Sequence, residues 1–196
     1  MRKRKLFWQL YLLNLVLIVV ALGAFTYLTT RSFENSLLEQ VSADLLLRAE
    51  LMRDEITRTW RLEGEGAVQK ICLDLGERTG TRITVVGVDG RVIADSRHDP
   101  RTMENHGNRP EIRGAMAGTR STFTRFSRTL DMNFMYAAVQ VRDSGRMRGV
   151  LRASVPLRTV ETSVRALQLQ ILLGGLVIAV LAGLISYFVS RRITRP

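Results

Sequence analysis

Two long apolar runs constrain this chain more than any other feature. Residues 6–28 and residues 169–189 contain no charged side chain. About 20 helical residues, at roughly 1.5 Å of rise each, span the hydrocarbon core of a bilayer. We therefore predict two transmembrane helices, at residues 6–28 and 167–190.

The charges that flank the two runs predict how the chain crosses the membrane. Segments rich in Lys and Arg stay in the cytoplasm. We expect residues 1–5 and 191–196 to be cytoplasmic and residues 29–166 to lie outside, in a two-pass protein of the cell membrane. A cleaved signal peptide ending near Gly23 is the alternative for the first run. Seven basic residues and no acidic one make up the flanks: Arg2, Lys3, Arg4, Lys5, Arg191, Arg192 and Arg195.

The distribution of charge also bears on partners. The net charge is +11, but between the two apolar runs 22 basic residues are balanced by 18 acidic ones. The remaining excess is explained by membrane topology, and no stretch interleaves basic and aromatic residues as a nucleic-acid surface does. We therefore expect membrane lipid, and no nucleic acid, among the partners.

A long helix is predicted to follow the first apolar run. No glycine or proline occurs between Gly23 and Gly64, so the helix can continue beyond the membrane. The apolar pattern predicts an amphipathic helix over residues 29–62, whose apolar side would pack on a domain or on a second copy of the chain. The residues that share about half of its circumference are Phe33, Leu37, Val41, Leu45, Met52, Ile56 and Trp60.

After Gly64 the pattern changes from helical to strand-like. A short helix is expected at residues 66–78. The following β-branched and alternating runs are typical of strands, and their order favours an antiparallel arrangement. The strand candidates lie at residues 81–88, 91–95, 119–129, 132–141 and 148–155. Five antiparallel strands with helices before and between them predict an α+β domain.

Local motifs fix the turns of this domain. Asp89 and Gly90 predict a two-residue hairpin turn of type I′, in which both residues take φ > 0. Pro110 predicts the start of a short helix that ends near Gly118. Because Cys72 is the only cysteine, no internal disulfide is available and the stability of the domain must come from an apolar core.

Three segments carry a resemblance to a known family. The segment DGRVIADSRHDPRTMENHGNRPEI, at residues 89–112, and the segment GVLRASVPL, at residues 149–157, resemble the extracytoplasmic PAS-like (Cache-type) domain of phosphate-regulon-type sensor histidine kinases. The closing RRITRP, at residues 191–196, resembles the start of a HAMP domain. The resemblance covers most of residues 33–196 and implies a PAS-like sensor domain between two membrane helices.

The same resemblance implies a function. The chain would be the sensory and transmembrane part of a two-component sensor histidine kinase, acting as a homodimer on an external ligand or protein and addressing a response regulator. A kinase also needs a phospho-accepting helix and a nucleotide domain, which this sequence lacks. We therefore expect no catalytic residue and no cofactor here, with ATP and Mg²⁺ confined to a missing kinase core. The alternatives are the input half of a chemoreceptor or cyclic-dinucleotide enzyme, and a membrane-anchored binding protein without an output domain.

Arginines on the third predicted strand are the candidate ligand-binding residues. Arg120, Arg125 and Arg128 lie near Tyr136 of the next strand, and the ligand cavity of PAS-like folds lies against this part of the sheet. Arginine holds anionic groups through paired hydrogen bonds. Alternation along a strand places Arg120 and Arg128 on one face and Arg125 on the other. A solvated sheet face is the alternative interpretation.

Two further patterns bear on binding and packing. His98 and His106 share a polar loop with carboxylates but lack the spacing of a preformed metal cage, so we expect solvated side chains and no metal site. In the second apolar run, Gly175, Ala179 and Gly183 form a stripe of small residues. Small residues at a spacing of four let another membrane helix approach closely.

Overall fold

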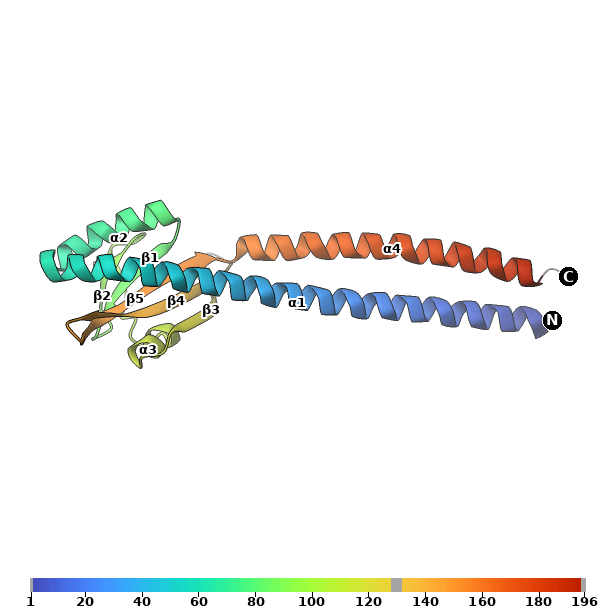
Figure 1. Ribbon diagram of the computed structural model, residues 1–196, viewed down its shortest axis with the longest axis horizontal. Helices are drawn as coiled ribbons and strands as arrows, with labels where there is room; N and C mark the ends of the chain where they lie inside the picture. The colour runs from blue at the N-terminus through green and yellow to red at the C-terminus, as the bar shows by residue number, and fades with distance from the viewer. Residues whose placement is uncertain (1, 128–131, 195–196) are drawn as a thin grey trace. The chain divides into compact units, whose positions relative to one another are not determined.

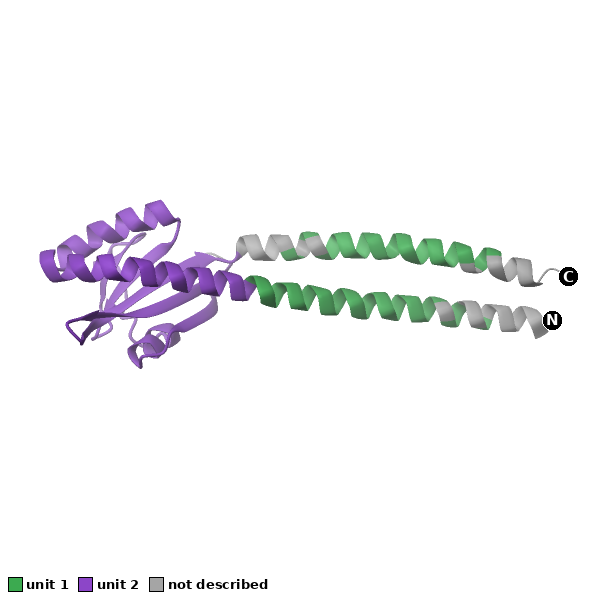
Figure 2. Ribbon diagram, viewed as in Figure 1, with its two compact units in different colours: residues 1–37, 160–196 green, residues 38–159 purple. Residues whose placement is uncertain are grey.

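The computed structural model describes residues 2–127 and 132–194, and the chain divides into two compact units (Figure 2). One unit contains Met1–Leu37 and Val160–Pro196, and the other contains Leu38–Thr159. We call the second one the sheet unit. Each unit has its own arrangement of helices or strands.

The sheet unit is an α+β domain built around five strands (Figure 1). The strand order is β2-β1-β5-β4-β3, and all neighbouring pairs are antiparallel. The predicted α+β class, the five-stranded antiparallel sheet and the long N-terminal helix are confirmed. The elements are α1 (Arg2–Glu63), which enters this unit at Leu38, α2 (Glu65–Thr79), β1 (Arg82–Gly87), β2 (Val92–Asp95), the 3₁₀ helix η1 (Pro100–Thr102), α3 (Pro110–Met116), β3 (Ser121–Ser127), β4 (Met132–Asp143) and β5 (Arg146–Pro156).

Alternation along the strands gives the sheet two different faces. Met135 and Val139 of β4 line grooves together with residues of α1, so the odd-numbered residues of β4 face α1. The even-numbered residues of β4 face α3, which lies on the opposite side of the sheet (Figure 1). The buried cluster under α3 consists of Val86, Ile112, Ala115, Ala138 and Val150.

Within the sheet unit, α1 is amphipathic as its sequence predicts. The sequence left open whether this apolar side packs on a domain or on a second copy of the chain. In this part of the helix it packs on the chain's own sheet unit. Three leucines on another side stay exposed: Leu47, Leu51 and Leu62, at 55%, 71% and 71%. The buried residues of α1 are Leu45, Ala49, Met52, Ile56 and Trp60.

The apolar side of α2 places Cys72 in the core. Val68, Cys72 and Leu75 are buried at the helical spacing read from the sequence. Burial raises the pKa of the Cys72 thiol to about 12, and the negative charge of Asp95 contributes to the rise. The thiol is therefore protonated at neutral pH and packs as a small apolar side chain.

The hairpin between β1 and β2 differs from the prediction. Gly90 has a φ of 81°, whereas Asp89 is not among the residues with positive φ, so the predicted type I′ turn at this position is wrong. The Gly90 N–H donates to the Gly87 carbonyl at 2.9 Å, and the Gly87 N–H donates to the Arg91 carbonyl at 2.8 Å. These bonds close a three-residue loop with a glycine bulge, which needs only one left-handed residue.

The hairpin with two left-handed residues joins β4 to β5. Asp143 pairs with Arg146 across this turn. Ser144 and Gly145 have φ of 49° and 81°, which meets the type I′ requirement of φ > 0 at both central residues. The type I′ turn therefore occurs where strand pairing leaves a two-residue loop, at Ser144 and Gly145. It does not occur at Asp89 and Gly90, where strand pairing leaves a three-residue loop.

The other unit consists of the first part of α1 and of α4 (Arg158–Thr194). Among the residues that the structure describes, two helices are long and apolar enough to cross a membrane, at Leu15–Glu63 and Gln168–Ile185.

Two residues of the small-residue stripe of α4, Gly175 and Ala179, lie beside α1 within this unit. A Cβ added to Gly175 would lie 3.5 Å from Cδ2 of Leu22, which is an ordinary van der Waals distance, so the packing at this point does not require glycine. Ala179 lines the same crevice between the two helices. Gly183, the third residue of the stripe, is half-buried.

Gly90 and Gly145 form a matched pair for testing the hairpins. Both have a φ of 81°. A Cβ on Gly90 would meet the side-chain oxygen of Asn105 and would lie 2.8 Å from Cα of Gly107, whereas a Cβ on Gly145 meets nothing within 4 Å. We expect Gly145→Ala to lower the free energy of unfolding by about 1 kcal/mol and Gly90→Ala by about 2 kcal/mol or more. Urea denaturation followed by tryptophan fluorescence measures both, and equal losses would contradict the close contact at Gly90.

Candidate ligand-binding site

The sheet face under α3 holds polar side chains that are buried. Thr84, Asp95 and Glu111 are fully buried, and Arg152 and Ser154 are 3% and 2% exposed. Burying a charged group is costly unless it is paired and hydrogen-bonded. The ion pairs and hydrogen bonds among these side chains therefore decide which polar groups on this face of the sheet remain available to a ligand.

The sequence brings Arg152 and Glu111 together from two distant segments. Arg152 is the one charged residue in GVLRASV of β5. The strand register pairs it with Thr84 of β1 and Ala138 of β4, which places all three on the face toward α3. Glu111 follows Pro110 in the first turn of α3, where proline favours helix initiation.

A chain of charge-assisted contacts joins α3 to the sheet. The Nη1 of Arg152 lies 3.3 Å from Oε1 of Glu111 in a buried ion pair. The Nη2 of Arg152 donates to the Thr84 hydroxyl at 3.1 Å, and this hydroxyl donates to Oδ2 of Asp95 at 2.8 Å. Burial lowers the pKa of Arg152, and the charge of Glu111 offsets part of that shift.

Asp95 anchors the other end of this chain. Its carboxylate accepts from Nε of Arg82 at 3.1 and 3.2 Å. It also accepts from the backbone N–H groups of Arg97 and His98, at 2.9 and 3.0 Å. Asp95 therefore fixes the start of the polar loop that follows β2.

Three buried polar atoms around Arg152 lack a hydrogen-bond partner among the residues that the structure describes. They are Nε of Arg152, Oε2 of Glu111 and Nδ1 of His106. An unsatisfied buried donor or acceptor costs about 1–3 kcal/mol, so buried polar groups are normally paired. The unpaired atoms include a cationic donor and an anionic acceptor, which an ordered water or a small polar ligand would satisfy.

Tyr136 lies between two guanidinium groups. The Cζ of Arg125 is 4.9 Å from the centre of the Tyr136 ring, and the Cζ of Arg152 is 5.2 Å from it. A cation over an aromatic face is attracted by the ring quadrupole. Arg125 makes no ion pair with another described residue, so its donors remain available to a ligand.

His106 was expected to be a solvated loop residue, and the structure corrects this. It is only 8% exposed. Its pKa is lowered to about 4, first by burial and then by the positive charges of Arg152 and Arg109. His106 is therefore neutral at pH 7, whereas His98 of the same loop is exposed.

The structure separates the arginines that the sequence analysis grouped. Arg125 and Tyr136 lie together on the face toward α3. Arg120 precedes β3, and its Nε contacts Oε1 of Glu50 in α1 at 2.9 Å, away from that site. Arg128 lies outside the described residues.

Sequence reasoning missed the residues at the centre of the cluster. Arg152 interrupts an apolar strand, and such an isolated charge in a buried run could have marked it. Glu111 gave no comparable indication, because a glutamate in the first turn of a helix is common on surfaces. Only the packing of α3 on the sheet shows that Glu111 is buried.

Comparison with solved structures shows which known domains share this fold. No protein-family model and no curated protein matches the chain. The sensor domain of the histidine kinase DctB of V. cholerae matches with a TM-score of 0.56 at 16% identity, over 73% of this chain and 58% of that one. The chain has the fold of a bacterial sensor domain.

Two chemoreceptor domains have the same fold. The ligand-binding domain of Campylobacter jejuni Tlp3, in complex with 4-methylisoleucine, matches with a TM-score of 0.54 at 13% identity, over 74% of this chain and 62% of that one. That of Pseudomonas aeruginosa PctC, in complex with GABA, matches with a TM-score of 0.52 at 16% identity, over 74% and 62%. The chain thus spans about three-fifths of the length of the sensor domains it matches.

The Arg152–Glu111 pair predicts an asymmetric response to mutation. Glu111→Leu leaves a buried guanidinium without its carboxylate, and we expect the free energy of unfolding to fall by about 3 kcal/mol or more. The double variant E111L/R152M removes both charges and should recover most of this loss. Urea denaturation of the full chain in detergent measures both variants. A double variant as unstable as the single one would contradict the role of the unpaired charge.

His106 predicts a pH dependence of stability. Its pKa is about 4 in the folded protein and about 6.5 in an unfolded chain, so the unfolded state binds more protons between these values. Stability should therefore fall as the pH drops from about 6.5 to about 4, by about 2–3 kcal/mol from this residue. His106→Gln should remove that part of the difference between unfolding free energies at pH 7.5 and 4.5. The control His98→Gln, at an exposed position, should leave the difference unchanged.

Proposed function

We propose that this chain is the sensory and membrane part of a two-component sensor histidine kinase of the phosphate-regulon type. The observation that carries the proposal is a sensor-domain fold in a chain with two apolar helices that are long enough to cross a membrane. The basic flanks support cytoplasmic termini and an external sheet unit. A ligand would act by stabilising one of two helix packings that already exist in equilibrium.

The ligand that the site fits best is a small molecule with an acidic group. Arg125 offers free donors beside Tyr136, and Arg152 offers an unpaired Nε. Guanidinium groups bind carboxylate and phosphate oxygens through paired hydrogen bonds. The compounds bound to Tlp3 and PctC, 4-methylisoleucine and GABA, both carry a carboxylate. Oε2 of Glu111 supplies an acceptor for a donor on the same molecule.

A homodimer is part of the proposal. Leu47, Leu51 and Leu62 lie within about 60° of the circumference of α1, at about 100° per residue, and are exposed. Such a stripe is the kind of surface that a second copy of the helix covers in a parallel pair.

We propose a histidine kinase as the output domain because residues 89–112 and the closing RRITRP, at residues 191–196, resemble sensor kinases. ATP, Mg²⁺ and a response regulator would then belong to a kinase core that this sequence lacks. The input half of a chemoreceptor is the second candidate, because the Tlp3 and PctC domains match about as well as that of DctB. Any residues encoded after Pro196 would distinguish the two candidates. A kinase needs a helix with a phospho-accepting histidine, whereas a chemoreceptor needs a long array of heptads.

A labelling experiment tests the placement of the sheet unit. In a Cys72→Ser background, a membrane-impermeant maleimide should label Ser144→Cys in spheroplasts and should leave Lys3→Cys unlabelled until the membrane is opened. Labelling of Lys3→Cys in sealed spheroplasts would contradict the proposed topology.

Thermal shift of the full chain in nanodiscs tests the ligand class. The probes are L-valine, GABA, succinate and inorganic phosphate. A ligand at a hundred times its Kd adds about 2.7 kcal/mol to stability, which raises Tm by several degrees. Arg125→Ala should remove the shift, and the control Arg97→Ala, at an exposed arginine outside the site, should retain it. A shift that survives in Arg125→Ala would place the ligand elsewhere.

A further inference from the structure

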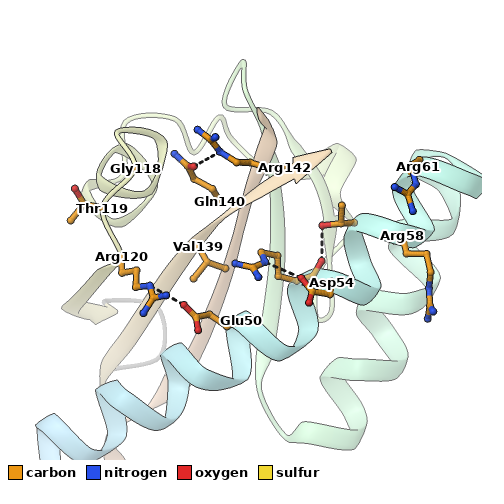
Figure 3. Close-up of a pocket in the computed structure, with 12 residues that line it drawn as sticks. Glu50, Asp54, Arg58, Arg61, Gly118, Thr119, Arg120, Val139, Gln140 and Arg142 are labelled. Atoms are coloured by element: carbon orange, nitrogen blue, oxygen red, sulfur yellow. Dashed lines mark hydrogen bonds and ion pairs between the residues drawn. The ribbon is translucent and has the colours of Figure 1, made fainter. Parts of the chain in front are cut away.

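A groove beside α1 forms a second polar surface on the sheet unit. Its volume is about 530 Å³. Three segments line it: the α1 side from Glu50 to Arg61, the connection Gly118–Arg120 and the end of β4 (Figure 3). Val139, which faces α1, is part of the lining. None of the residues that form the site under α3 lines this groove, so the two surfaces are distinct.

The groove is strongly cationic. Five arginines and two carboxylates line it: Arg53, Arg58, Arg61, Arg120, Arg142, Glu50 and Asp54. Arg58 has no ion-pair or hydrogen-bond partner among the residues that the structure describes. Arg142 donates from Nε to Oε1 of Gln140 at 2.7 Å, so its charge also lacks a carboxylate in the described chain. The groove thus presents uncompensated positive charge.

The existing ion pairs of the groove are exchangeable. Arg120 contacts Glu50 at 2.9 Å, and its side chain is 70% exposed. Arg61 lies 3.6 Å from Asp143 and is 52% exposed. Ion pairs in water are worth only about 0–1 kcal/mol each. These guanidinium groups can therefore change partners at little cost when an anionic molecule enters the groove.

The arrangement of the arginines favours an extended occupant. The α1 residues that line the groove, from Glu50 to Arg61, cover about three helical turns, or roughly 16 Å. Figure 3 shows Arg58 and Arg61 at one end, Arg120 toward the other and Arg142 across from α1. The charges do not converge on one point, as a site for a single small anion requires. They match a chain that carries several acidic groups.

The edge of β4 adds a backbone surface at the same place. β3 pairs with β4 only as far as Ala138, which is opposite Ser121. Beyond Ala138, no other described strand pairs with β4 on this side, although β4 continues to Asp143. An extended segment beside a strand edge can use such backbone groups while its side chains contact pockets.

We infer that this groove docks an extended acidic segment of an external partner protein. Its carboxylates would pair with Arg58 and Arg142, which lack carboxylate partners, and would exchange with Glu50 and Asp143 for Arg120 and Arg61. The inference does not depend on a small ligand at Arg125 and Arg152.

Binding of a labelled deca-glutamate peptide tests the inference. Fluorescence anisotropy would follow its binding to the full chain in phosphatidylcholine nanodiscs at low salt. We expect R58E/R142E to weaken binding by about tenfold or more, since two attractive contacts become repulsive. The matched control R97E/R113E changes the net charge equally at exposed arginines outside the groove, and should weaken binding by less than about twofold. Far-UV circular dichroism verifies that both variants are folded.

Three results would overturn the inference. The first is wild-type affinity in R58E/R142E. The second is an equal loss in R97E/R113E, which would show that net charge alone attracts the peptide. The third is displacement of the peptide by citrate as effectively as by unlabelled peptide at equal carboxylate concentration, because that would indicate a small-anion site.

Discussion

The buried ion pair between Arg152 and Glu111 is the interaction on which the sensor face depends. α3 has only seven residues, too few for a helix that is stable by itself. It is held on the sheet by the apolar packing of Ile112 and Ala115 and by the pair that joins Glu111 to Arg152. The side-chain Nε2 of Gln140 in β4 also donates to the Met116 carbonyl at 3.2 Å. Buried ion pairs contribute little net stability compared with apolar packing. A ligand that reached Arg152 would therefore compete for the partner that positions α3, and its binding would change the contact between this helix and the sheet.

The parts of the fold that follow from local periodicity could be predicted from the sequence. The α1 pattern gave the buried side at Leu45, Met52, Ile56 and Trp60, and the strand runs gave all five strands. The turn at Asp89 was wrong because the dipeptide does not fix the loop length, which depends on which residues of β1 and β2 pair. Of the candidate site, the sequence brought together only Arg125 and Tyr136, since they lie on adjacent strands, and their role in binding stays a prediction. Glu111, Thr84 and Arg152 come from segments far apart in the chain, and only tertiary packing brings them together.

The sheet presents different chemistry on its two sides. The side under α3 holds few charges, deeply buried and nearly balanced, which suits a small molecule that must be desolvated. The groove beside α1 holds exposed arginines in excess, which suits a partner recognised through many weak contacts. α1 is one continuous helix from Arg2 to Glu63, so a partner in the groove contacts the same helix that contains the first apolar run.

The buried thiol of Cys72 has a consequence for the environment in which the chain works. Thiol–disulfide exchange proceeds through the thiolate, and a pKa of about 12 leaves almost none of it at neutral pH. Cys72 is also the only cysteine of the chain and is shielded by the core. An oxidant therefore finds no reactive thiol at Cys72, and the packing of α2 on the sheet is insulated from the redox state of the surroundings.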